Sequence, residues 1–251
     1  MNIQPRSKPP TKTRGPKMAG KHAVLSPSGA EKWVNCPGSA RMEQVFKDEE
    51  QPSIYAAEGT AAHFLASEHM IGGDLPDSKV GETIIISGDV CCFGTNIPLN
   101  VSLVEYEIEI TEEMHGHVSK YIADVHEFKG PDGILDGEQR LDISPITGEE
   151  DAEGTADVVI LRGTQLQVHD LKYGRKPVGV VENKQLLLYA YAAYLYYAML
   201  AEIESILLVI HQPRVLEEPI TWQITVAEMY EYIEGIKAAA EVASSLLTVE
   251  K

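Results

Sequence analysis

The sequence contains little cysteine and no long apolar run. Three cysteines, Cys36, Cys91 and Cys92, are too few and too unevenly spaced for a disulfide framework, so we expect reduced thiols. No apolar run approaches about 18 residues, and the longest, 186–201, carries five tyrosines, which predicts a buried helix and no membrane span. The basic N-terminus has no apolar segment behind it, so we expect no secretory signal and an intracellular, cytoplasmic protein.

Positive charge is also scarce, since 21 basic residues face 38 acidic ones and the formal net charge is -17. This balance argues against a protein that coats nucleic acid through broad electrostatics. Residues 1–22 are an exception, with six basic and no acidic residues, which leaves 15 basic and 38 acidic residues, a formal -23, for the remainder. The pattern predicts a disordered basic arm over 1–22 that either solubilises the protein or touches a polyanion.

The order of the predicted elements indicates one α/β domain over 23–251, with a mixed central β-sheet flanked by helices. Ser26 or Ser28 is expected to cap the first helical piece, and Thr111 to cap a later helix. Expected helices are two short pieces on either side of Pro37, then 54–70, 111–128, 182–202 and a last helix ending at 247; expected strands are 101–110, 134–143, two within 154–174, 205–213 and one from 220. Residues 72–100 are expected to be irregular, with one short strand around 84–86.

A tight turn at Gly163 and Thr164 would pair its flanking strands so that Asp157 lies opposite Asp170. Like charges that face each other destabilise a sheet unless something lies between them, and a hard cation such as Mg²⁺ or Mn²⁺ takes carboxylate oxygens. Alternation places Lys172 on the face of Asp170, where its ammonium can assist attack on a phosphodiester. Taken alone, however, Asp170 and Lys172 are equally consistent with a surface ion pair.

Three further side chains have two readings each. Gln185 and Tyr189 share a helix face at spacing i, i+4, so they either point together at the end of the sheet or form a polar pair within a packed helix. His63 lies on a mostly apolar helix face, where a histidine is more often a core residue than a metal ligand.

Together these residues resemble the PD-(D/E)XK nuclease superfamily, in the branch of RecB-like, CRISPR-associated and lambda-type exonucleases. The resemblance spans about 25 to 212, and its phage and prophage members are the most similar. The motifs that carry it are Glu138 in "GEQRLDI", Asp157 in "GTADVVI", Asp170-Leu171-Lys172 in "VHDLKYG", Gln185 to Tyr189 in "NKQLLLYAY", His63 in "GTAAH" and the opening "LSPSGAEKWVNCPGS".

The resemblance implies a restriction-endonuclease-like core and a role for each motif residue. Asp157 and Asp170 would be metal-binding carboxylates, His63 a further metal ligand, Lys172 the catalytic lysine, Gln185 and Tyr189 residues that position DNA or support the site, and Glu138 either a supporting acid or an exposed one. The implied cofactor is Mg²⁺ or Mn²⁺. Several members of the branch also hold an iron-sulfur cluster with one early and three late cysteines, but no cysteine follows Cys92, so no cluster is expected and Cys36 is assigned a structural role.

The implied function is a metal-dependent DNA exonuclease in phage recombination or DNA end processing. Its partners would be DNA and a recombination partner such as a single-strand annealing protein, in the cytoplasm of a bacterial host and without a membrane. Arg140, Arg162, Lys184 and the basic arm are candidate phosphate contacts. The alternative is a catalytically inactive nuclease-fold protein that acts as a DNA-binding or assembly module, which the acidity favours slightly.

Overall fold

Two β-sheets organise the chain in the computed structural model, which describes residues 23–46, 53–88, 90–97 and 104–247. One sheet has five strands in the order β4-β5-β6-β7-β8, with β6 and β7 parallel and the other neighbours antiparallel, and the other has three antiparallel strands in the order β2-β1-β3. The predicted α/β class with a mixed central sheet is therefore confirmed. The predicted basic arm, 1–22, lies outside the described residues.

The strands are β1 (Thr83–Ser87), β2 (Val90–Phe93), β3 (Tyr106–Glu109), β4 (Ile134–Asp142), β5 (Glu153–Arg162), β6 (Gln165–Leu171), β7 (Ser205–His211) and β8 (Ile220–Thr225). The α-helices are α1 (Ala30–Asn35), α2 (Gly38–Val45), α3 (Ile54–Met70), α4 (Glu112–Lys129), α5 (Ser144–Thr147), α6 (Lys184–Tyr197) and α7 (Val226–Leu247), and the 3-10 turns are η1 (Pro27–Gly29), η2 (Asp77–Lys79) and η3 (Gly94–Asn96). No helix in the described ranges combines the length and the apolar character needed to cross a membrane.

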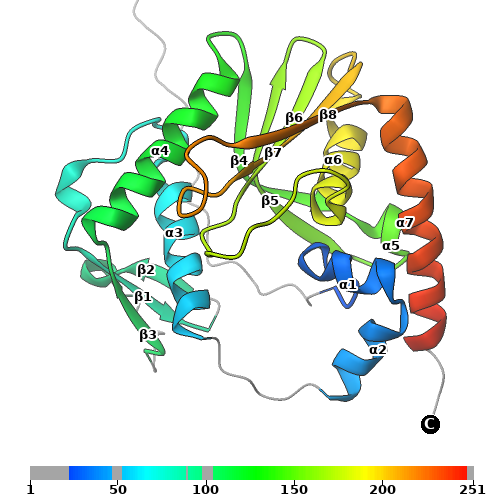
Figure 1. Cartoon of the computed structure of the whole chain (residues 1–251), viewed down its shortest axis with the longest axis horizontal. Coiled ribbons are helices and arrows are strands. Elements are labelled where there is room, and N and C mark those ends of the chain that lie inside the picture. Colours follow the sequence, from blue (N-terminus) through cyan, green and yellow to red (C-terminus); the bar gives the residue numbers. More distant parts are fainter. Residues whose placement is uncertain (1–22, 47–52, 89, 98–103, 248–251) are drawn as a thin grey trace, which may run out of the picture.

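Helices cover both faces of the five-stranded sheet (Figure 1). On one face α6 and α7 pack on the sheet together with α1, and on the other face α3 and α4 pack between it and the small sheet. Each face has its own hydrophobic core, and the central strand β6 is buried along nearly its whole length. A charged side chain on β6 is therefore desolvated, even near the end of the strand.

The hairpin that joins β5 to β6 has the predicted register. Gly163 has a φ of +58°, a left-handed conformation that tight hairpin turns require and that glycine adopts without strain. The pairs run from Arg162 with Gln165 to Val158 with His169, as a turn at Gly163 demands. The turn chemistry was thus sufficient to align the two strands.

Local signals also set several helix boundaries correctly. The Ser26 hydroxyl accepts a hydrogen bond from the N–H of Gly29, and Thr111 accepts one from Met114 at the start of α4. The predicted helix over 182–202 is shorter in the structure: the Asn183 side chain accepts the N–H of Leu186, so α6 begins at Lys184, and it ends at Tyr197. Side-chain caps satisfy N–H groups that have no partner inside a helix.

The region 72–100 departs from the prediction of an irregular segment with one strand. β1 and β2 form a hairpin, and β3 adds to the other side of β1, so that Ile84 lies opposite Ile108. Ile84 is fully buried against the core on the α3 side of the large sheet. Pairing with β3 depends on tertiary contact across a gap in sequence, which a local pattern does not reveal.

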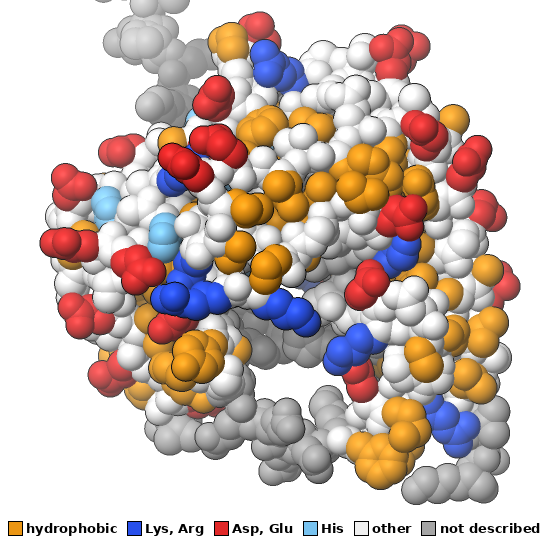
Figure 2. Space-filling view, in the orientation of Figure 1, with side chains coloured by type: hydrophobic (Ala, Val, Ile, Leu, Met, Phe, Trp, Pro, Cys, Tyr) orange, Lys and Arg blue, Asp and Glu red, His pale blue; other side chains and the backbone are white. Residues whose placement is uncertain are grey.

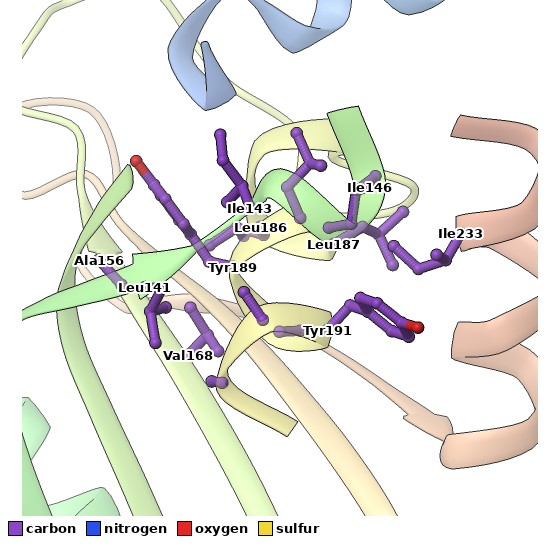
Figure 3. Close-up of a cluster of buried hydrophobic side chains, with 14 of the residues drawn as sticks. Leu141, Ile143, Ile146, Ala156, Val168, Leu186, Leu187, Tyr189, Tyr191 and Ile233 are labelled. Atoms are coloured by element: carbon purple, nitrogen blue, oxygen red, sulfur yellow. The ribbon is translucent and has the colours of Figure 1, made fainter. Parts of the chain in front are cut away.

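Figure 3 shows how α6 is held in the core on its side of the sheet. Leu186 and Leu187 pack among side chains of β4, α5 and α7, and Tyr189 and Tyr191 point in different directions. The Tyr191 hydroxyl points toward α7, where it accepts a hydrogen bond from Lys237 at 3.4 Å. The predicted buried helix is confirmed, and its packing fixes the orientation of its first turn beside the end of β6.

Candidate active site

The candidate site lies where the pairing of three neighbouring strands is interrupted. The ladder between β4 and β5 skips one step, at which Glu138 lies opposite Asp157. Glu138 has a φ of +50°, a conformation that is strained for a residue with a side chain. The ladder between β5 and β6 ends one step before Asp157 and Asp170. Three adjacent strands therefore each place one carboxylate at the same break in the sheet.

The carboxylate of Asp157 connects β5 to β6 at the point where their backbone pairing has ended. Its Oδ2 accepts a hydrogen bond from the N–H of Leu171 at 2.8 Å, and its Oδ1 lies 3.3 Å from Nδ1 of His63 on α3. Burial raises the pKa of Asp157, but the charge and hydrogen bond of His63 and the Leu171 N–H outweigh it, so the pKa lies below its usual value. Asp157 is therefore an ionised carboxylate at neutral pH.

Asp170, which is buried, and Lys172, which is partly exposed, form an ion pair. The Lys172 Nζ donates to Oδ1 of Asp170 at 3.0 Å and lies 2.8 Å from Oδ2, without the geometry of a hydrogen bond to that second oxygen. Asp170 is only 3% exposed. Burial raises the pKa of Asp170, and the nearby negative charge of Asp157 raises it too. Lys172 lowers this pKa, but the net result is a pKa raised to about 6. Lys172 therefore does not fully compensate the negative charge of the two aspartates.

Helix α6 supplies the second side-chain partner of Lys172. Gln185, in the first turn of α6, accepts a hydrogen bond from Lys172 Nζ at 2.8 Å. Burial raises the pKa of Tyr189, and a hydrogen bond with Gln185 partly offsets that rise. Tyr189 packs closely on β5, because a Cβ at Gly154 would lie 2.8 Å from its ring. The two side chains that share a face of the predicted helix thus both reach the site.

His63 lines a small cavity beside the carboxylates. The cavity, of about 10 Å³, is lined by His63, Ala66, Ser67, Met70, Tyr121, Glu138 and Asp157. Burial lowers the pKa of His63, because it disfavours the charged ring. The charge and the hydrogen bond of the Asp157 carboxylate together outweigh burial and raise this pKa to about 9. At neutral pH the site thus holds two cationic groups, His63 and Lys172, among its carboxylates.

We expect the stability of the protein to fall as the pH rises from about 6.5 to 9. The pKa of His63 is about 9 in the folded protein and 6.5 in an unfolded chain, so its contribution is complete below 6.5 and is lost as the pH rises through 9. Thermal unfolding of the wild type and of His63→Gln at pH values across this window measures the effect. A pH-dependent fall of the same size in His63→Gln would contradict the assignment.

The donor types at the site suit a hard divalent cation. Asp157 and Asp170 offer carboxylate oxygens, and Oδ2 of the buried Asp170 makes no hydrogen bond to the described residues. Within the ranges the structure describes, no three histidine, cysteine, aspartate or glutamate side chains form a ready-made metal-binding group. His63 and Lys172 neutralise the carboxylates instead, so a cation would bind in competition with the proton of His63.

The structure brings together all seven residues that the sequence marked for this site. Six of them come from five elements: His63 from α3, Glu138 from β4, Asp157 from β5, Asp170 from β6, and Gln185 and Tyr189 from α6; Lys172 directly follows β6. Sequence reasoning missed Tyr121 of α4, which lines the same cavity. Tyr121 lies among the apolar inward-facing residues of its helix, where the pattern gives a tyrosine no distinguishing signal.

The candidate phosphate contacts bind other parts of the protein. Arg140 forms an ion pair with Glu153, Arg162 donates to the carbonyl of Phe128, and Lys184 lies 3.6 Å from Glu182. Several Lys and Arg side chains nevertheless lie along the gap between α3 and the α1–α2 pair, with acidic side chains beside some of them (Figure 2). Arg175, just after β6, has a side chain that is 72% exposed and lies 3.8 Å from Glu113. Basic side chains thus occur together on this face of an otherwise acidic protein.

The three cysteines are free, and Cys36 is exposed at the end of α1. The structure therefore gives Cys36 a position at the helix end and shows no packing role for it.

One protein family matches the chain over residues 22–248, and its description is "Protein of unknown function (DUF2800)". The match includes both sheets, all the α-helices and every residue of the candidate site.

Proposed function

The chain belongs to the DUF2800 family, whose description states no function, and from the geometry of the site we propose that it hydrolyses phosphodiester bonds of DNA with a divalent metal ion, as an exonuclease. The observation that carries the proposal is the buried cluster at the break in the sheet, in which Lys172 links Asp170 to Gln185 beside Asp157. Desolvated charges destabilise a fold unless they are paired, and titratable groups with shifted pKa values are concentrated at functional sites.

Asp157 and Asp170 would hold the cation, with His63 as a further ligand once it has lost its proton. Bound Mg²⁺ or Mn²⁺ would supply Lewis-acid stabilisation of the phosphate charge and lower the pKa of the attacking water. The resemblance to PD-(D/E)XK nucleases, carried by these same residues, supports this choice of cofactor.

Lys172 would stabilise the charge that develops on the phosphate oxygens. Its ammonium is fixed between Asp170 and Gln185, at 3.0 and 2.8 Å, and its side chain is 27% exposed, so it can reach a substrate from a preorganised position. Gln185 orients Lys172, and Tyr189 supports Gln185 from the next turn of α6. Glu138 would act as a supporting acid at the edge of the cavity.

The Lys and Arg side chains along the gap between α3 and the α1–α2 pair support binding of a polyanion to an otherwise acidic protein, because the local potential around a binding site can differ from the net charge. From the resemblance to PD-(D/E)XK nucleases we also propose a role in phage recombination or DNA end processing. The protein would act in the cytoplasm of a bacterial host, with a single-strand annealing protein as partner.

A second candidate is an inactive nuclease-fold protein that binds DNA or assembles with other proteins. The observation that favours it is the ion pairing of both aspartates with protein cations, His63 and Lys172, which stabilises the site in the absence of any metal. The hydrogen bond from Lys172 to Gln185 argues for the active form, because it fixes the ammonium beside the carboxylates.

The test is to incubate the protein with linear double-stranded and single-stranded DNA and Mg²⁺ or Mn²⁺, beside Lys172→Ala and the control Lys237→Ala. Lys237 has a similarly exposed side chain, 28%, and an acidic partner, Glu234, but lies on α7 away from the site. We expect cleavage by the wild type and by Lys237→Ala, and none with a chelator. Equal inertness of all three proteins with every metal and substrate would overturn the nuclease proposal.

A further inference from the structure

Tyr121 combines complete burial with an unused hydroxyl. The residue is 2% exposed, and its Oη has no hydrogen-bond partner among the described residues. Its ring packs edge-on against His211, with centroids 4.8 Å apart, so the ring is held firmly. A buried hydroxyl without a partner destabilises a fold, whereas a phenylalanine would pack in the same place without that cost. Packing on α4 therefore explains the ring of Tyr121 and leaves its hydroxyl unexplained.

The hydroxyl belongs to the carboxylate side of the site. Tyr121 lines the cavity that also contains His63, Glu138 and Asp157. Burial first, and then the charges of Asp157, Asp170 and Glu138, raise the pKa of Tyr121 far above its usual value. The phenol therefore keeps its proton at any working pH and can serve as a hydrogen-bond donor.

The cavity has room for one water-sized group. Its volume of about 10 Å³ is at the lower limit for a single ordered water, which needs about 10–15 Å³ and two to four polar partners. Its lining includes Tyr121, whose hydroxyl is an unused donor, and Asp157 and Glu138, whose carboxylates are acceptors. A water molecule can satisfy this combination, since it accepts from the phenol and donates to the carboxylates.

We propose that Tyr121 is a positioning residue, whose hydroxyl holds one water molecule in the cavity between His63, Glu138 and Asp157. Its catalytic part rests on the proposed function: a water fixed there keeps Asp157 and Glu138 in place for the reaction. The proposal assigns a use to a hydroxyl that contributes nothing to packing.

The test compares the wild type with Tyr121→Phe, and uses Tyr191→Phe as a control that removes a buried hydroxyl remote from the site. In crystal structures at about 1.5 Å resolution, we expect an ordered oxygen about 2.6–3.2 Å from Tyr121 Oη in the wild type, and none in Tyr121→Phe. Loss of one positioning hydrogen bond should lower kcat by about 5- to 20-fold with KM for DNA within about twofold, while Tyr191→Phe keeps its kcat.

The outcomes separate this proposal from the nuclease proposal. No ordered oxygen at Tyr121 Oη in the wild type, or an oxygen that persists in Tyr121→Phe, overturns the water site. An ordered oxygen that is lost in Tyr121→Phe supports the site even if the wild type fails to cleave DNA, in which case the nuclease proposal alone fails. An active wild type with an unchanged kcat in Tyr121→Phe overturns the positioning role.

Discussion

Lys172→Ala is expected to lower the rate of metal-dependent DNA cleavage by about 100- to 1,000-fold, the usual effect of removing one preorganised charge from a reaction site. The ammonium of Lys172 is held by Asp170 and Gln185, so the substitution removes a charge from a preorganised position. Single-turnover rates on linear DNA with Mn²⁺, for the wild type and the variant, measure the effect. A variant as fast as the wild type would show that Lys172 is structural.

The same substitution should destabilise the protein by an amount that depends on pH. Removing one partner of a buried ion pair leaves the other charge buried, which costs about 3–5 kcal/mol. In the wild type the pKa of Asp170 is about 6, and it rises further without Lys172, which lowers it. A carboxylate with a raised pKa favours the folded state at low pH and loses that contribution as the pH rises through the folded pKa. The loss of unfolding free energy caused by Lys172→Ala should therefore be large at about pH 8 and smaller at about pH 5.

Chemical denaturation at both pH values checks this dependence. Lys237→Ala is the matched control, because its ion pair with Glu234 is at the surface, and such pairs contribute about 0–1 kcal/mol. A loss of equal size at the two pH values would show that Asp170 is not the origin of the destabilisation.

Asp157→Asn is expected to abolish the high pKa of His63 and to lower DNA cleavage by about 100- to 1,000-fold. An asparagine oxygen can still accept the N–H of Leu171, so the break between β5 and β6 should keep its geometry. What disappears is the negative charge that raises the pKa of His63 to about 9 against burial. With burial then dominant, the pKa of His63 should fall below its ordinary value of 6.5.

The titration of the His63 ring proton, followed by NMR over about pH 5–10, measures this fall, and a His63→Gln spectrum identifies the signal. The unfolding temperature of Asp157→Asn at about pH 9 serves as control, because His63 contributes little there in the wild type. A His63 that still titrates near 9 in Asp157→Asn would mean that another group raises its pKa.

The register of the β5–β6 hairpin and the cap at Thr111 were predictable because each depends on a few adjacent residues. A left-handed glycine fixes a hairpin, and a hydroxyl fixes the start of a helix. The residues of the site were also named from sequence, by turn arithmetic for Asp157 and by resemblance for His63. What the pattern of alternation did not show is that the ladder breaks at Asp157, so that its carboxylate replaces a strand partner for Leu171.

The sequence by itself determined the α/β class, the hairpin that aligns Asp157 with Asp170, and the proximity of Lys172 to Asp170, since these follow from local geometry and strand period. The tertiary structure alone decided that Glu138 joins the two aspartates across the break, that β1, β2 and β3 form a second sheet, and that Tyr121 brings a buried hydroxyl to the cavity. The physical reason is sequence separation. Contacts between distant segments depend on how helices pack on the two faces of the sheet, and neither composition nor period specifies that packing.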